Sequence, residues 1–104
     1  SSAASDVYKR QVCFQMDVYW TVIGKAAPVE YFHKYPGRFK VLHIKDHLDV
    51  GKSGMVGFDA IFSNIDVAGA AEFVVEQEAF VDNDWKAGLK ASADYLLHCL
   101  QHRR

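Results

Sequence analysis

The hydrophobic and polar positions along this chain follow two periods in alternation, one typical of strands and one typical of helices. Three short apolar runs, each bounded by polar or turn residues, predict strands at 12–17, 39–45 and 72–78. After each run, apolar residues recur at helical spacing and predict helices at 27–35, at 58–66, and from Asp82 or Asp84 to about Leu100. The pattern therefore predicts the order strand, helix, strand, helix, strand, helix.

The predicted helices carry start and stop signals of their own. Pro28 lies near the first turn of the first helix, Pro36 and Gly37 follow its end, and Gly69 ends the second helix. We expect one face of each helix to be buried: Val29, Phe32 and His33 in the first, Phe58, Ile61, Phe62 and Ile65 in the second, and Trp85, Leu89, Leu96 and Leu100 in the third.

This alternation favours a parallel sheet with right-handed crossovers, and therefore an α/β fold. Asp17, His43 and Glu76 stand at the ends of the three strands, 26 and 33 residues apart. Each unit of a (β/α)8 barrel takes roughly 31 residues, since about 250 residues are divided among eight units. Three units do not close a barrel. We therefore predict a partial TIM barrel with two open strand edges, which predicts association with further chain or with another copy in a homo-oligomer.

The ends of the predicted strands carry ionisable side chains where turn residues are usual. Asp17, His43 and Glu76 should meet at one face, because the carboxyl ends of parallel barrel strands converge there. Two carboxylates and an imidazole suit a divalent metal such as Mn²⁺, Mg²⁺, Co²⁺ or Zn²⁺, with water or substrate oxygens completing its shell. Strand parity alone does not separate Glu76 from Glu78, although Glu76 directly follows the apolar centre of its strand and should lie deeper.

Each of these residues also has a structural interpretation. His43 is compatible with a hydrogen-bonded core histidine, Lys45 and Asp46 with a surface ion pair, and 76–78 with a solvated strand end. The same pattern of ionisable side chains at the ends of all three strands favours a functional site over these structural interpretations. Lys45 then either contacts a substrate oxygen or phosphate or pairs with a carboxylate, and Trp20 either walls a sugar pocket or belongs to the core.

Composition narrows the class of protein. The chain has 104 residues, 24% of them charged, and a formal net charge of -1, which is too near neutral for a nucleic-acid or membrane-surface partner. No apolar run approaches the roughly 20 residues of a membrane-spanning helix. Cys13 and Cys99 fit no disulfide pattern, so we expect two reduced, buried cysteines and a cytoplasmic protein.

The first eleven residues, SSAASDVYKRQ, are small or polar and show no periodicity. They end abruptly where the first apolar strand begins. We predict a non-native or disordered leader at 1–11, and a C-terminal part of a larger barrel at 12–104.

Four segments carry a resemblance to a known family: VCFQMDVYW, PVEYFHKYPGRFKVLHIKD, GFDAIF and EFVVEQE. In this order they closely resemble the C-terminal part of the sugar phosphate isomerase/epimerase family, which has the xylose isomerase-like barrel. The resemblance covers nearly all of the chain from Val12 to Leu100 and implies the last three β/α units of a TIM barrel.

The resemblance also implies chemistry. Members bind a divalent metal through Glu, Asp, His and Glu, and three of these ligands fall on Asp17, His43 and Glu76, whereas the first Glu would precede Val12. The implied reaction is proton transfer through an enediolate of a sugar or sugar phosphate, with Glu76 as one of two acid/base groups. Some epimerases place a His shortly after the Asp ligand, where this chain has Trp20.

Two alternatives to an isomerase or epimerase stay open. The same scaffold can carry an inosose-type dehydratase, which product analysis would distinguish. The chain can also be a catalytically inactive fragment, since one implied metal ligand and one acid/base group are missing from it. Cleavage at abasic DNA would want more metal-binding histidines and a basic groove, which this sequence lacks.

Overall fold

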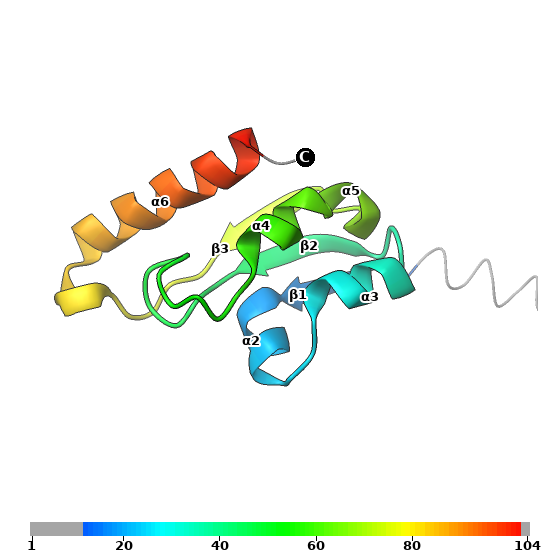
Figure 1. Ribbon diagram of the computed structural model, residues 1–104, viewed down its shortest axis with the longest axis horizontal. Helices are drawn as coiled ribbons and strands as arrows, with labels where there is room; N and C mark the ends of the chain where they lie inside the picture. The colour runs from blue at the N-terminus through cyan, green and yellow to red at the C-terminus, as the bar shows by residue number, and fades with distance from the viewer. Residues whose placement is uncertain (1–11, 103–104) are drawn as a thin grey trace, which may run out of the picture.

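A computed structural model describes residues 12–102 and shows three strands, each followed by helical segments (Figure 1). The predicted leader, 1–11, lies outside the described residues. The elements are β1 (Phe14–Asp17), α2 (Val18–Ile23), α3 (Pro28–Lys34), β2 (Phe39–Ile44), α4 (Phe58–Ser63), α5 (Ile65–Ala68), β3 (Glu72–Val75), the 3-10 helix η1 (Val81–Asn83) and α6 (Trp85–Gln101).

The strands form one parallel sheet in the order β1-β2-β3, which confirms the predicted α/β topology (Figure 1). Along β2 the side chains alternate between two environments. Leu42 and Ile44 are fully buried, whereas Val41 and His43 are only partly buried. Asp17 pairs in register with His43, so the two side chains project from the same face of the sheet.

Helices α3, α4 and α5 bury most of the residues that the apolar spacing predicts, but His33 of α3 is exposed, and the second predicted helix is broken in two. Phe32 of α3 is fully buried, as are Phe58 and Ile61 of α4 to within 1% exposure. The second predicted helix is divided into α4 and α5 at Asn64, whose side-chain amide donates to the Ala60 carbonyl oxygen at 2.7 Å. This bond satisfies a helix-terminal carbonyl locally and accompanies the break.

The buried face of α6 differs from the predicted stripe. Trp85 and Leu89 are 56% and 44% exposed, so their expected burial is wrong. The helix turns a face of smaller residues toward the fold, because only small residues let its backbone approach the loop after β2 so closely. A Cβ on Gly88 would lie 2.7 Å from Asp49 Oδ1. Neither α6 nor any other helix within 12–102 is long and apolar enough to cross a membrane. The buried residues of α6 are Gly88, Ser92, Leu96 and Cys99.

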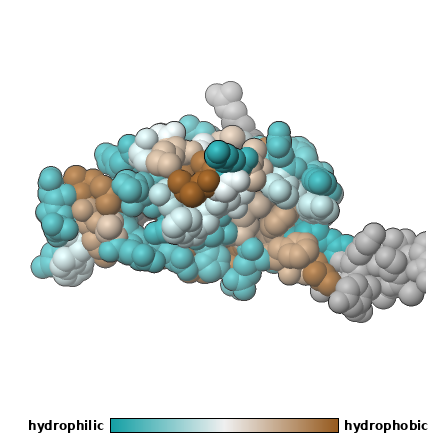
Figure 2. All heavy atoms as spheres, turned by 90° about the horizontal axis from the view of Figure 1, so that it is seen from below, coloured by the Kyte–Doolittle hydropathy of each residue, from teal (hydrophilic) through white to brown (hydrophobic). Residues whose placement is uncertain are grey.

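Several apolar side chains at the two sheet edges are exposed. Cys99 is buried as expected, but Cys13 is exposed, because it lies just before β1 at an edge of the sheet; both cysteines are free. Val74 and Val75 of the other edge strand are 41% and 47% exposed. Figure 2 shows hydrophobic groups on one face that are interrupted by hydrophilic residues. Both edge strands thus leave apolar surface uncovered within the described part of the chain.

Candidate metal centre

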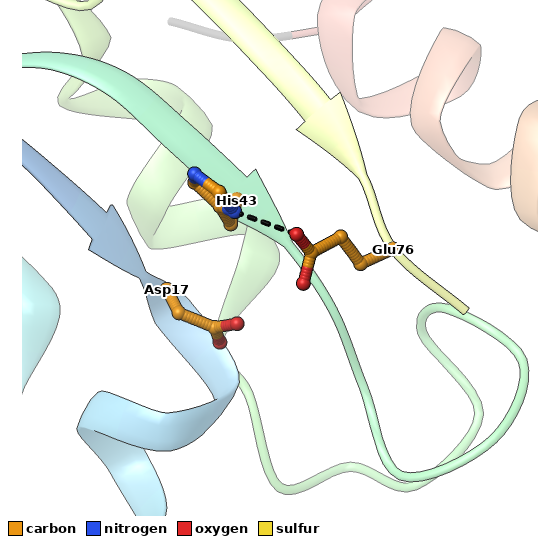
Figure 3. Close-up of side chains that lie close together, drawn as sticks. All are labelled: Asp17, His43 and Glu76. Atoms are coloured by element: carbon orange, nitrogen blue, oxygen red, sulfur yellow. Dashed lines mark hydrogen bonds and ion pairs between the residues drawn. The ribbon is translucent and has the colours of Figure 1, made fainter. Parts of the chain in front are cut away.

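Three side chains from three different strands converge at the carboxyl ends of the sheet (Figure 3). Asp17 is the last residue of β1, His43 is the fifth residue of β2, and Glu76 directly follows β3. The Glu76 amide donates to the Ile44 carbonyl oxygen at 3.0 Å, which extends the parallel ladder by one residue. One potential ligand atom from each of the three side chains lies within 4.8 Å of the other two.

His43 lies at the middle of this cluster. Its Nδ1 is 2.8 Å from Glu76 Oε1, and its Nε2 is 2.8 Å from Gln15 Oε1. An ionised carboxylate only accepts hydrogen bonds, so the Nδ1–H group of His43 donates a hydrogen bond to Glu76. The side chains of His43 and Glu76 are 25% and 41% exposed, so solvent or a ligand reaches the cluster.

Asp17 is oriented by the helix that follows it. Asp17 Oδ1 accepts from the Trp20 amide at 3.0 Å and caps the N-terminus of α2. The second carboxylate oxygen of Asp17 has no hydrogen bond within 12–102. Helix α2 was not predicted, although an Asp before an apolar run is a recognised start signal. The capping bond leaves one Asp17 oxygen for a ligand.

The donor set has the chemistry that a divalent cation requires. Two carboxylates and one imidazole supply hard oxygen donors and a nitrogen donor, which Mn²⁺, Co²⁺ and Zn²⁺ accept, whereas Mg²⁺ prefers the oxygens. The carboxylates come from separate strands and face a common point, and partial exposure leaves coordination positions for other oxygens. Asp17, His43 and Glu76 therefore fit a divalent cation, and Glu78, which is exposed, is not part of the cluster.

The two predicted substrate-binding residues lie beside the cluster in different environments. Trp20 is 58% exposed and packs edge-on against Tyr19, with ring centroids 5.1 Å apart. Together with Asp17 and Gln15 it lines an open cavity of about 510 Å³ along the edge of β1. Lys45 is only 7% exposed, and its Nζ lies 5.6 Å from the centre of the Tyr19 ring. Trp20 thus faces an accessible space, whereas Lys45 is held against an aromatic wall.

The interpretation of Lys45 and Asp46 as a surface ion pair is wrong. Asp46 is 2% exposed and accepts hydrogen bonds from the amides of His47 and Gly51, at 2.7 and 2.9 Å, and from the Ser53 hydroxyl. Its carboxylate organises the loop after β2. The spacing of Asp46, Gly51 and Ser53 within one polar loop was the available signal, because buried Asp carboxylates commonly bind nearby loop amides.

A second polar network was also missed. Gln77 Nε2 donates to Asp49 Oδ1 at 2.7 Å, and the Ser92 hydroxyl donates to Gln77 Oε1 at 2.8 Å. Ser92 and Asp49 are 1% and 6% exposed. No local pattern in the sequence indicates this contact, because its members are separated by 28 and 15 residues along the chain.

Comparison with known proteins agrees with the predicted fold. No protein-family model and no curated protein matches the chain. Two solved structures, both described as a sugar phosphate isomerase/epimerase from Parabacteroides distasonis ATCC 8503, are 42% and 48% identical to it, each with a TM-score of 0.76. They match 85% and 86% of this chain, which spans 31% and 32% of their own length.

The two likenesses are close in both sequence and fold, and they confirm the predicted partial TIM barrel. With three parallel strands in the expected order, the chain resembles the sugar phosphate isomerase/epimerase family in both sequence and fold, and it spans about a third of the length of the two structures it matches.

Proposed function

We propose that these residues form part of a metal-dependent sugar phosphate isomerase or epimerase. The observation that carries the proposal is the convergence of Asp17, His43 and Glu76 at the ends of three parallel strands, with potential ligand atoms within 4.8 Å of one another. The two similar structures, described as a sugar phosphate isomerase/epimerase, support the class of reaction.

In this proposal Asp17, His43 and Glu76 hold the cation. When bound, the cation supplies Lewis-acid polarisation of the carbonyl and hydroxyl oxygens of the sugar. Asp17 offers the oxygen that does not cap α2, and Glu76 offers the oxygen that does not face His43. The Asp17 cap holds that side chain in place before a ligand arrives, which reduces the ordering needed on binding.

Glu76 also has the position of an acid/base group. Its carboxylate would accept a proton from the hydroxyl-bearing sugar carbon beside the carbonyl and return it to the carbonyl carbon. The proton of that hydroxyl passes to the former carbonyl oxygen, and the two transfers together interconvert an aldose and a ketose. Epimerisation needs a second acid/base group on the opposite face of that carbon. In the proposed whole protein this group comes from outside the three strands described, since the chain spans only about a third of its relatives.

The surroundings of the cluster suit a sugar. Trp20 presents an exposed indole beside the cavity of about 510 Å³, and sugar rings stack on such surfaces. Lys45 places a cation near the same end of the sheet and is proposed to contact a substrate oxygen or phosphate. The proposed partner is therefore a small sugar or sugar phosphate.

Manganese binding tests the site directly. We expect the 104-residue chain to bind Mn²⁺ weakly, as measured by the electron paramagnetic resonance signal of free Mn²⁺. Glu76→Gln should weaken this binding by roughly tenfold or more, because it removes an anionic ligand. Glu78→Gln is the matched control: it makes the same chemical change two residues further on, at an exposed side chain outside the cluster, and should leave binding unchanged.

The two variants separate the possible results. Equal weakening by both substitutions would refute the site, because a general loss of negative charge would then explain the binding. The reaction itself is tested in a longer protein that contains these residues, by following aldose–ketose interconversion with and without His43→Ala. Full activity in that variant would refute the function, and loss of water from the sugar would indicate a dehydratase.

A further inference from the structure

Glu76 lies where the sheet no longer holds the chain. The pairing of β2 with β3 ends at Ile44 and Val75, and the Glu76 amide makes the last backbone bond to the sheet. Within 12–102, the backbone of residues 77–79 makes no hydrogen bond to another backbone group. Figure 3 shows Glu76 on the segment beyond the arrowhead of β3, with its carboxylate turned toward His43. Something other than strand pairing must therefore fix this segment.

The side chain of the next residue supplies that attachment. Gln77 Oε1 accepts from the Ser92 hydroxyl at 2.8 Å, while Gln77 Nε2 donates to Asp49 Oδ1 at 2.7 Å and to the Ala79 carbonyl oxygen at 3.2 Å. One amide thus ties the end of β3 to α6, to the loop after β2 and to its own turn. We call Gln77, Asp49 and Ser92 the Gln77 network.

Ser92 and Asp49 of the Gln77 network are buried, and Gln77 is partly buried. Ser92 is 1% exposed, and its oxygen also accepts from the Val50 amide at 3.0 Å, while the Val81 amide lies 3.5 Å from Asp49 Oδ1. No buried side-chain nitrogen or oxygen within the described residues lacks a partner. Hydrogen bonds to buried groups favour one geometry, because a displacement of Gln77 would leave the buried Ser92 hydroxyl without its acceptor.

The close approach of α6 to the Gln77 network depends on Gly88, which has no side chain. A Cβ added at Gly88 would lie 2.7 Å from Asp49 Oδ1 and 2.6 Å from Phe80 Cδ1. Gly88 and Ser92 are one helical turn apart and both are buried. The small residues on this face of α6 therefore let the helix backbone reach the polar groups that attach to Gln77.

We infer that Gln77 is a positioning residue for the metal centre: Ser92 and Asp49 fix its side chain, and this holds Glu76 against His43. This inference rests on the proposed function. Glu76 contacts His43 while its neighbour Gln77 contacts α6, so two successive side chains hold the segment from different directions. Removing a partner that hydrogen-bonds directly to a metal ligand typically changes metal affinity by roughly 10- to 100-fold, and Gln77 acts one residue away from the ligand, so we expect a change at the lower end of this range.

The test uses the full 104-residue chain with Gln77→Ala, Ser92→Ala and the double variant. Two readouts are followed: Mn²⁺ affinity, and, without metal, the ¹⁵N chemical shift of His43 Nδ1, which reports its hydrogen bond to Glu76. Each single variant should weaken Mn²⁺ binding by roughly tenfold and shift the Nδ1 resonance. The double variant should be little worse than Gln77→Ala, because both substitutions break the same attachment.

Ile61→Val is the control for general destabilisation. Ile61 is 1% exposed and belongs to α4, so this variant should lower the unfolding temperature without altering the Nδ1 resonance or the Mn²⁺ affinity. If Gln77→Ala does not fold, the milder Ser92→Ala decides through the same two readouts. An unchanged Nδ1 resonance in a folded Gln77 or Ser92 variant would overturn the inference. If the unsubstituted chain binds no Mn²⁺ but the resonance shifts as expected, the proposed metal site fails while the positioning of Glu76 by Gln77 holds.

Discussion

Replacing Asp46 by Asn should destabilise the fold far more than the same change at an exposed Asp. Asp46 is 2% exposed, and three donors converge on its two carboxylate oxygens: the amides of His47 and Gly51 and the hydroxyl of Ser53. An Asn side chain has one oxygen, and an NH₂ group replaces the other. Whichever way the amide is turned, a backbone N–H that Asp46 now satisfies would face a donor.

The magnitude follows from that count. A hydrogen bond to a charged group contributes about 1.5–3 kcal/mol, and an unsatisfied buried donor costs about 1–3 kcal/mol. These two contributions describe partly the same loss and do not add in full, so we expect Asp46→Asn to lower the free energy of unfolding by about 2–4 kcal/mol. Urea unfolding followed by far-UV circular dichroism measures this difference through the midpoint at unchanged slope.

Asp94→Asn is the matched control for this variant. Asp94 is exposed on α6, and among the described residues its side chain pairs with Lys90 alone, at 2.7 Å and four residues away. Solvent screens such an exposed pair, so this substitution should be nearly neutral. Equal losses in Asp46→Asn and Asp94→Asn would refute the reasoning, because the buried carboxylate would then hold the loop no better than a surface charge.

Two further predictions concern backbone strain and alkaline pH. Gly54→Ala and Gly69→Ala both place a side chain at positive φ, which costs about 1–2 kcal/mol. Only the Cβ at position 69 would meet backbone, 2.8 Å from Gly37 Cα, so thermal unfolding should show the larger loss of stability for Gly69→Ala. Equal losses in the two variants would contradict the close approach of the two backbones. Burial raises the pKa of Tyr95 to about 12, whereas an unfolded Tyr ionises near pH 10. The stability from this shift should be complete below about pH 10 and lost as the pH rises through about 12, and a Tyr95→Phe variant that kept the same alkaline loss would show another cause.

The sequence predicts the strands and their order well, because each strand is a short apolar run that ends at polar or charged residues. Strand parity also places Asp17 and His43 on one face, and the register between β1 and β2 agrees. The buried face of α6 could not be predicted in the same way. Leu89 is the more hydrophobic candidate, yet Ser92 is buried, since helix packing depends on how closely two backbones approach and not on hydrophobicity alone.

The exposure of apolar side chains at the sheet edges also could not be predicted from the sequence pattern. Phe73, Val74 and Val75 form a continuous apolar run typical of a strand buried on both faces, yet Val74 and Val75 are 41% and 47% exposed. An apolar run predicts that a strand is compatible with a buried position, whereas its actual burial depends on which elements lie next to it. At β3 the described residues supply a neighbouring strand on one side only.

The number of free lone pairs separates the structural carboxylates from those available to a ligand. Asp46 and Glu76 each lie just after a strand, at the same end of the sheet. In the fold, donors engage both oxygens of Asp46, whereas Asp17 and Glu76 each have one oxygen without a hydrogen bond within 12–102. A buried carboxylate with donors on both of its oxygens stabilises a loop and has less capacity left for a cation. The strand ends therefore combine both roles within a few residues: His43 joins the candidate metal centre, and Asp46 holds the loop that follows it.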